Sequence, residues 1–126
     1  ENFKIFDNFF LYNEHYFPSK KIIINYLKSD LYINLSRIES FGITFVEALS
    51  ANLPILTFNT KGANEIVKNN FNGYIVENKN NFTFCKKILS FNKNRNIFKA
   101  NPLKSSYKYD LDKLKNKYIK VYQTDL

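Results

Sequence analysis

Two carboxylates, Glu39 and Glu47, enclose a segment with no other ionisable side chain, ESFGITFVE, and the residues up to Pro54 are apolar, small or uncharged. We expect a helix from about Gly42 to Ala51, with apolar side chains on nearly every side, as in a buried helix. A lone carboxylate there costs free energy unless a partner satisfies it. Glu47 therefore has either a structural partner, such as the backbone of an adjacent loop, or a functional one. Its two oxygens could accept hydrogen bonds from the hydroxyl groups of a polyol.

The segments around these acids predict an α/β fold. Residues 3–12 suit a strand followed by a loop. A buried strand is expected over 30–36 and further strands over 53–59 and 74–77. Helices are expected over 20–29, 42–51, 63–69, 80–91 and 109–123. Strands that alternate with helices through short links predict a parallel, Rossmann-like sheet flanked by helices. A complete doubly wound domain has about five or six strands, so we expect part of this sheet to be missing.

The turn before the 42–51 helix suits a phosphorylated ligand. Glu39, Ser40, Phe41 and Gly42 connect a parallel strand to its following helix, and ligands of open α/β sheets bind at this edge. The start of the helix offers free N–H groups and a positive dipole end, which suit phosphate. Gly42 would let a ligand approach the backbone closely. Together, an acid, a set of amides and a second acid two turns later suit a sugar nucleotide.

At this point the sequence resembles a known family. The segment SRIESFGITFVEALSANLPILTFNTKGANEIVKNNFNGYIVEN, from Ser36, is similar to the core of the carboxyl-terminal, donor-binding domain of GT-B retaining glycosyltransferases, most like glycosyltransferase family 4. The shared features, in order, are a Ser, a Glu, a Phe-Gly pair and a second Glu eight positions after the first. A Pro-led strand, a Gly-x-x-Glu-Ile segment and an Asn-Gly turn follow. The resemblance extends from about Ile22 to the end of the chain.

The resemblance implies roles for individual residues. Glu39 would be the catalytic residue, facing the donor sugar ring, where it would help stabilise charge at the reacting carbon or hold sugar hydroxyls. Glu47 would bind the ribose hydroxyls of the nucleotide. The segment between them would contact sugar and phosphate, chiefly through its backbone: Ser40, Phe41, Gly42, Ile43 and Thr44. Gly62 is expected to be a turn glycine, and Asn72 and Gly73 to be structural.

The resemblance also implies how the chain is organised. Residues 1–126 would form one partial nucleotide-sugar-binding domain, with a lead-in over 1–21, an α/β core over 22–109 and a carboxyl-terminal helix over 110–126. An amino-terminal acceptor domain and the early part of the donor domain, whose Arg and Lys residues neutralise the diphosphate, are expected to lie outside this chain. The chain alone would then be an incomplete transferase. The alternative is a non-catalytic remnant or interaction module that keeps the fold.

Two positions depart from the family pattern. Asn52 stands where the family usually has Gly after the helix, and Asn is the next-best residue for a left-handed cap. Lys61 replaces the first of two common glycines, which could alter access near the donor. The predicted function is transfer of a sugar from a nucleotide-diphosphate sugar to an acceptor such as a glycan or lipid.

Composition and charge argue against several other classes of function. The chain has one cysteine, Cys85, which we interpret as a packing residue of a helix. Its one histidine, His15, is expected in a loop. Neither a metal nor another cofactor is therefore expected. The net charge of +8 is spread along the chain, which favours general solubility over nucleic-acid binding. A cytoplasmic protein is expected, and the basic charge permits peripheral membrane contact. No apolar run approaches the roughly 20 residues that span a bilayer.

Overall fold

A computed structural model describes residues 20–77, 80–93 and 95–124. Three parallel strands form one sheet in the order β1-β2-β3: β1 (Tyr32–Asn34), β2 (Ile55–Phe58) and β3 (Gly73–Val76). The helices are α1 (Lys20–Lys28), α2 (Ile43–Ser50), α3 (Lys61–Ile66), α4 (Asn81–Lys93), α5 (Asn101–Ser106) and α6 (Leu111–Thr124), with 3₁₀ turns η2 (Arg95–Ile97) and η3 (Tyr107–Tyr109). The predicted 3–12 strand and His15 lie outside the described residues.

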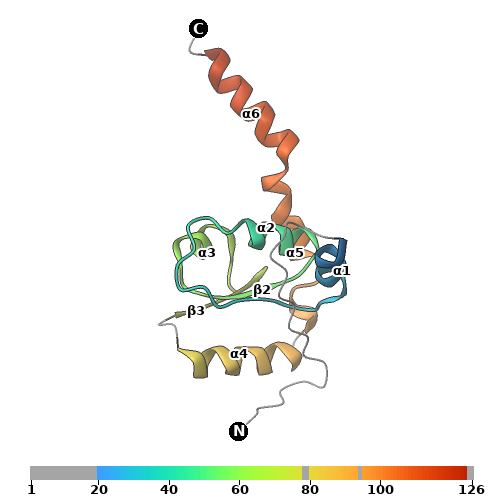
Figure 1. Ribbon diagram of the computed structural model, residues 1–126, viewed down its shortest axis with the longest axis vertical. Coiled ribbons are helices and arrows are strands. Elements are labelled where there is room, and N and C mark those ends of the chain that lie inside the picture. The colour runs from blue at the N-terminus through green and yellow to red at the C-terminus, as the bar shows by residue number, and fades with distance from the viewer. Residues whose placement is uncertain (1–19, 78–79, 94, 125–126) are drawn as a thin grey trace.

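Helices cover both faces of the sheet. In Figure 1, α2, α3 and α5 lie above the strands, α4 lies below them, and α1 lies at the right-hand end of the sheet. All four residues of β2 are buried, and its side chains alternate between two apolar clusters: Ile55 packs with α2 and α3, and Leu56 with α4. A strand buried on both faces reads as a nearly continuous apolar run, and ILTF is apolar except for Thr57. The prediction of an α/β, Rossmann-like parallel sheet flanked by helices is confirmed.

Strand β1 is less buried than its sequence suggested. It pairs with β2 and is the outer strand of the described sheet. Asn34 is buried, but Ile33 is 42% exposed and Leu35, just beyond the strand, is also exposed. The prediction of a fully buried strand was wrong because apolar composition does not report which strand has a neighbour on each side.

Helix α2 is buried on one face only. Phe45, Ala48 and Leu49 are buried, whereas Ile43 is 68% exposed. The prediction of a helix buried on all sides was therefore wrong. The outer face of α2 turns toward α1, and a pocket lies between these two helices.

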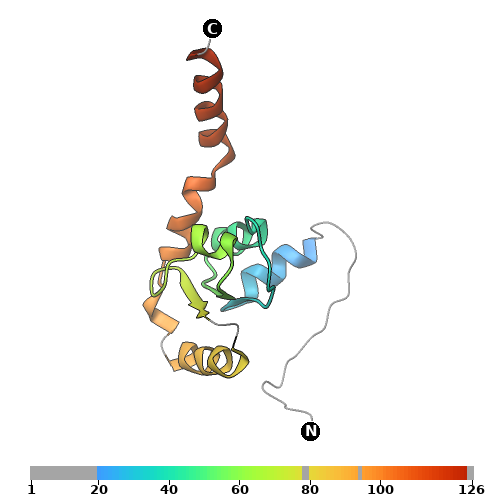
Figure 2. The same ribbon diagram turned by 90° about the vertical axis from the view of Figure 1, so that its left-hand side faces the viewer.

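The carboxyl-terminal third holds an element that the sequence did not predict. Helix α5 begins with Pro102 in its first turn, where a missing N–H does no harm, and it packs against α2. Helix α6 was predicted, but it points away from the domain (Figure 2), and Leu111 at its start is 81% exposed. The Leu111 side chain therefore does not reach the core of the domain. Cys85 lies on α4 as expected but is exposed, so its predicted packing role was wrong.

Candidate functional site

The loop that carries Glu39 is fixed to the start of α3. The backbone N–H of Gly62 donates to the carbonyl oxygen of Glu39, with N and O 2.8 Å apart. A Cβ atom at Gly62 would lie 2.7 Å from the carbonyl carbon and oxygen of Phe41. Gly62 is thus a close-approach residue inside the first turn of α3, and its predicted role as a turn glycine was wrong. Its missing side chain lets α3 pack directly on the loop.

The start of α2 is open toward the carboxyl edge of the sheet. Gly42 is its N-cap, with φ of +85°, and no side chain of the described residues caps this end. The left-handed backbone favours glycine, and a Cβ there would also strike the ring of Phe45, so Gly42 is needed for the turn itself. The first N–H groups of a helix have no intrahelical partner. Those of Ile43 and Thr44 therefore remain available beside Glu39.

Glu47 is exposed on the outer face of α2, contrary to the expectation of a buried carboxylate. It nevertheless has a protein partner: the phenol oxygen of Tyr26, on α1, donates to Oε2 of Glu47 at 3.2 Å. Burial raises the pKa of the Tyr26 phenol, and Tyr32 and Glu47 add to this effect. Like any tyrosine, the phenol carries its proton at neutral pH and donates it in this hydrogen bond, and Glu47 keeps one oxygen for another partner.

Glu47 and Tyr26 face a pocket of about 450 Å³ between α1 and α2. The polar side chains of its lining are those of Tyr26, Glu47 and Ser50, and the Ser50 hydroxyl already donates to the Val46 carbonyl at 2.8 Å. The remaining lining is aliphatic: Ile22, Ile23, Leu27, Ile43, Val46 and Ala51. A mostly apolar pocket with a few placed polar groups is typical of small-molecule sites.

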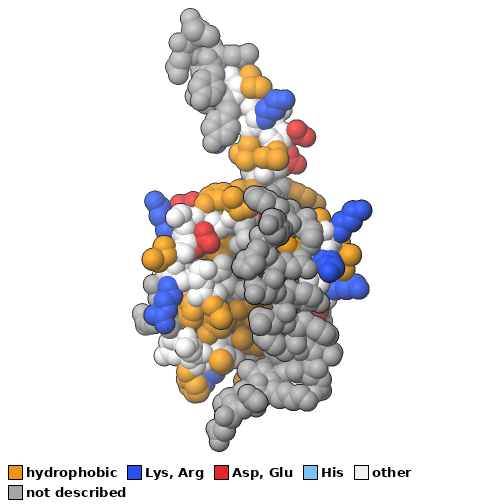
Figure 3. All heavy atoms as spheres, viewed as in Figure 1, with side chains coloured by type: hydrophobic (Ala, Val, Ile, Leu, Met, Phe, Trp, Pro, Cys, Tyr) orange, Lys and Arg blue, Asp and Glu red, His pale blue; other side chains and the backbone are white. Residues whose placement is uncertain are grey.

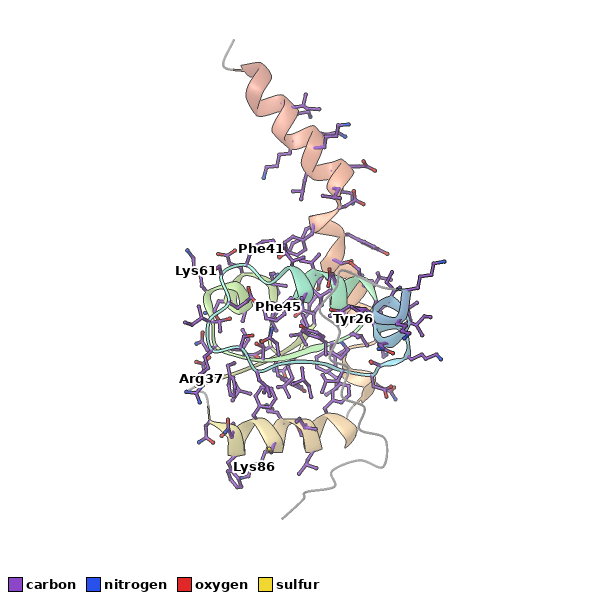
Figure 4. The ribbon with its side chains drawn as sticks, viewed as in Figure 1. Tyr26, Arg37, Phe41, Phe45, Lys61 and Lys86 are labelled. Carbon is purple, nitrogen blue, oxygen red and sulfur yellow. The ribbon has the colours of Figure 1, made fainter. Side chains whose placement is uncertain are left out.

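The predicted site residues fall into two neighbouring places. Glu39 is partly buried, and Gly42 is fully enclosed. The side chains of Ser40, Phe41, Ile43 and Thr44 are exposed around the loop and the start of α2, and Glu47 lies further along that helix, in the pocket. The Phe41 ring also meets Tyr109 edge-on, with centroids 6.0 Å apart, so η3 supports the loop from outside. In Figure 4, Phe41 lies above α2 while Phe45 points below it into the core.

Three flanking residues are accounted for by local structure. Asn72 is buried, accepts from the Lys68 N–H at 2.6 Å and donates to the Ile66 carbonyl at 3.0 Å, as its predicted structural role requires. Gly73 admits the carbonyl of Ile55 on the neighbouring strand. Asn52 has the predicted left-handed conformation, with φ of 61°.

Sequence reasoning missed Tyr26. It lies 21 positions before its partner Glu47, and its helix was predicted without any statement of what it would contact. A signal was available, because Tyr is the one residue of the apolar IIINYL run that combines an aromatic ring with a hydroxyl donor.

Charge is not concentrated at this site. Lys and Arg side chains are spread around the outline of the domain in Figure 3. Arg37 and Lys61, which follow β1 and β2, are exposed at the left of Figure 4. Within the described residues, no group of three or more His, Cys, Asp and Glu is arranged to hold a metal ion. None of the helices in that part of the chain is both long and apolar enough to cross a bilayer.

The fold and the site define a Rossmann-like α/β domain with an open helix start at the carboxyl edge of its sheet. The family model for glycosyl transferases group 1 matches residues 3–108, and the chain therefore belongs to the group 1 glycosyltransferases. Family membership supports glycosyl transfer as the general activity. A comparison with curated proteins finds no match.

Proposed function

We propose that this chain is the donor-binding part of a retaining glycosyltransferase of the GT-B type, most like glycosyltransferase family 4. It would bind a nucleotide-diphosphate sugar, whose sugar is passed to an acceptor such as a glycan or lipid. The observation that carries the proposal is the open start of α2 between two acids, one on the loop before it and one in the adjoining pocket.

Each part of the site suits one part of the donor. The free N–H groups at Ile43 and Thr44 suit the diphosphate, since they present donors and the positive end of the helix dipole. The open oxygen of Glu47 suits a ribose hydroxyl, and the aliphatic lining beside it suits the flat face of a base. Glu39, held by Gly62 at the edge of the sheet, suits the sugar ring. No further cofactor and no metal are part of this proposal.

Acceptor recognition would lie in a second, amino-terminal domain. The described sheet has three strands, fewer than the roughly five or six of a doubly wound domain, which supports the idea that further strands complete the donor site. Those strands would supply cations to neutralise the diphosphate. A cytoplasmic location, with possible contact to a membrane surface, belongs to the same proposal.

The test is sugar transfer by the natural protein that carries this chain, followed as release of nucleoside diphosphate from nucleotide sugars. Glu39→Gln and Glu47→Gln should each lower kcat/KM by about a hundredfold or more, because each removes charge from a group in contact with the donor. The matched control Glu65→Gln, at an exposed position of α3, should leave the rate unchanged. Near-normal rates in both site variants would refute the proposal.

A further inference from the structure

The Tyr26 side chain connects the two helices that line the pocket. Its phenol donates to Oε2 of Glu47 at 3.2 Å. Its ring contacts that of Tyr32 on β1, with centroids 5.8 Å apart, and Tyr32 in turn meets the ring of Phe45 edge-on at 6.2 Å. Because Phe45 is fully buried in α2, this row of three rings anchors the phenol to the core.

Glu47 lacks such an anchor of its own. It is exposed, and a free Glu side chain samples many rotamers, so ordering it on ligand binding has an entropic cost. A hydrogen bond from a fixed phenol orders the carboxylate before the ligand arrives, which removes that cost from the binding step. The phenol keeps its proton at neutral pH, as an ordinary tyrosine does, and burial and the nearby groups raise the pKa of Tyr26 further.

The arrangement also determines which oxygen remains for a ligand. Oε2 of Glu47 receives the phenol, which leaves Oε1 with its lone pairs. The Ser50 hydroxyl is directed to the backbone of its own helix. Oε1 is therefore the main acceptor that the pocket side chains offer to a hydroxyl group, beside an otherwise aliphatic lining.

We infer that Tyr26 is a positioning residue, which holds Oε2 of Glu47 so that Oε1 faces a ribose hydroxyl of the donor nucleotide. This inference rests on the proposed function, since it takes a nucleotide as the ligand of Glu47. It makes Tyr26 responsible for part of the preference for ribose over a sugar that lacks these hydroxyls.

The test measures binding of uridine diphosphate and guanosine diphosphate, and of their 2′,3′-dideoxy forms, to the natural protein that carries this chain, by calorimetry. Tyr26→Phe should weaken binding of the better ribonucleotide about tenfold, as expected for a hydrogen bond to a charged group. It should change binding of the dideoxy form less than about twofold. In a Glu47→Ala background, adding Tyr26→Phe should also change affinity less than about twofold, because the residue through which it acts is gone. Tyr32→Phe, which removes a hydroxyl from the adjacent ring, is the matched control and should behave as wild type.

The possible outcomes distinguish failure of the proposed function from failure of the positioning role of Tyr26. Failure of the wild-type natural protein to bind either ribonucleotide would refute the proposed function and this inference with it. If the wild type binds, three results would overturn the inference alone. Tyr26→Phe could weaken binding of the ribose and dideoxy forms equally, or it could leave the affinity unchanged. Its effect could also add to that of Glu47→Ala. A second measurement needs no nucleotide: the ¹³Cδ resonance of Glu47 should move toward that of exposed Glu65 in Tyr26→Phe. An unchanged resonance would contradict the positioning role.

Discussion

Replacing Gly62 by Ala tests whether close packing of α3 holds the loop of the candidate site. A Cβ atom at position 62 would lie 2.7 Å from the carbonyl carbon and oxygen of Phe41 and 3.0 Å from its nitrogen. Ordinary contacts of this kind are about 3.4 Å or longer, and all three atoms belong to the backbone. The loop must therefore move, and the 2.8 Å hydrogen bond from Gly62 to the Glu39 carbonyl is stretched with it.

The expected magnitude follows from opposing contributions. Ala is favoured over Gly by about 1 kcal/mol inside a helix, which would stabilise the variant. Overpacking of a filled site costs about 1–3 kcal/mol, and a lost hydrogen bond costs about 1 kcal/mol. The net result is a decrease in the free energy of unfolding of about 2 kcal/mol, or roughly 6–10 °C in Tm for a chain of this size.

Urea and thermal denaturation of the 126-residue chain measure this change. The pair Glu65→Ala and Glu65→Gly, at an exposed position of the same helix, calibrates the local difference between Ala and Gly. Gly62→Ala should be less stable than wild type although Glu65→Ala is more stable than Glu65→Gly. A Gly62→Ala variant as stable as wild type would refute the close-packing account.

Three further changes probe the supports of the fold and site. Asn52→Ala should lower the free energy of unfolding by about 2 kcal/mol in urea denaturation, because Asn52 has a φ of 61° and its side chain bonds to the Lys99 carbonyl and the Leu103 N–H. Asn52→Gly should lower it less. Equal losses in the two variants would exclude a contribution from backbone strain. Thr60→Ala should cost about 1 kcal/mol in thermal denaturation, since its hydroxyl caps α3 at the Ala63 N–H, and Thr60→Ser should restore most of the loss. The stability contribution of Tyr26 is fully present below about pH 10, where the unfolded phenol ionises, and is lost as the pH rises further toward the raised folded-state pKa. Tyr26→Phe should therefore lose less stability than wild type between about pH 10 and 11.5, and identical pH profiles would contradict the raised pKa.

The sequence predicted those elements whose burial follows from their own pattern. ILTF is apolar except for Thr57, and it forms the strand that has a neighbour on each side in the described sheet. Asn72-Gly73 was correctly placed at the entry to a strand because the turn chemistry is local. Helix α5 was missed because NPLKSS is short and polar, and its Pro reads as a break unless the helix begins there.

The site was less predictable because it depends on contacts between elements. The apolar residues of α2 were recognised, but their pattern did not reveal that Ile43 and Glu47 face a pocket rather than a neighbouring layer. The contact of Tyr26 with Glu47 depends on how α1 packs beside α2. The tight approach at Gly62 likewise depends on where α3 meets the loop, which no spacing within the sequence encodes.

An amide NMR titration of the chain with uridine- and guanosine-diphosphate sugars tests the central claim most directly, with Glu47→Gln as the control. If this is a donor-binding site, shifts should concentrate on residues 39–47 and on the Gly62 amide, which bonds to the same loop. The same shifts should be much reduced in Glu47→Gln, whose spectrum should otherwise match. A well-dispersed wild-type spectrum with no shifts in this segment would contradict the account and favour a module that keeps the fold without binding the donor.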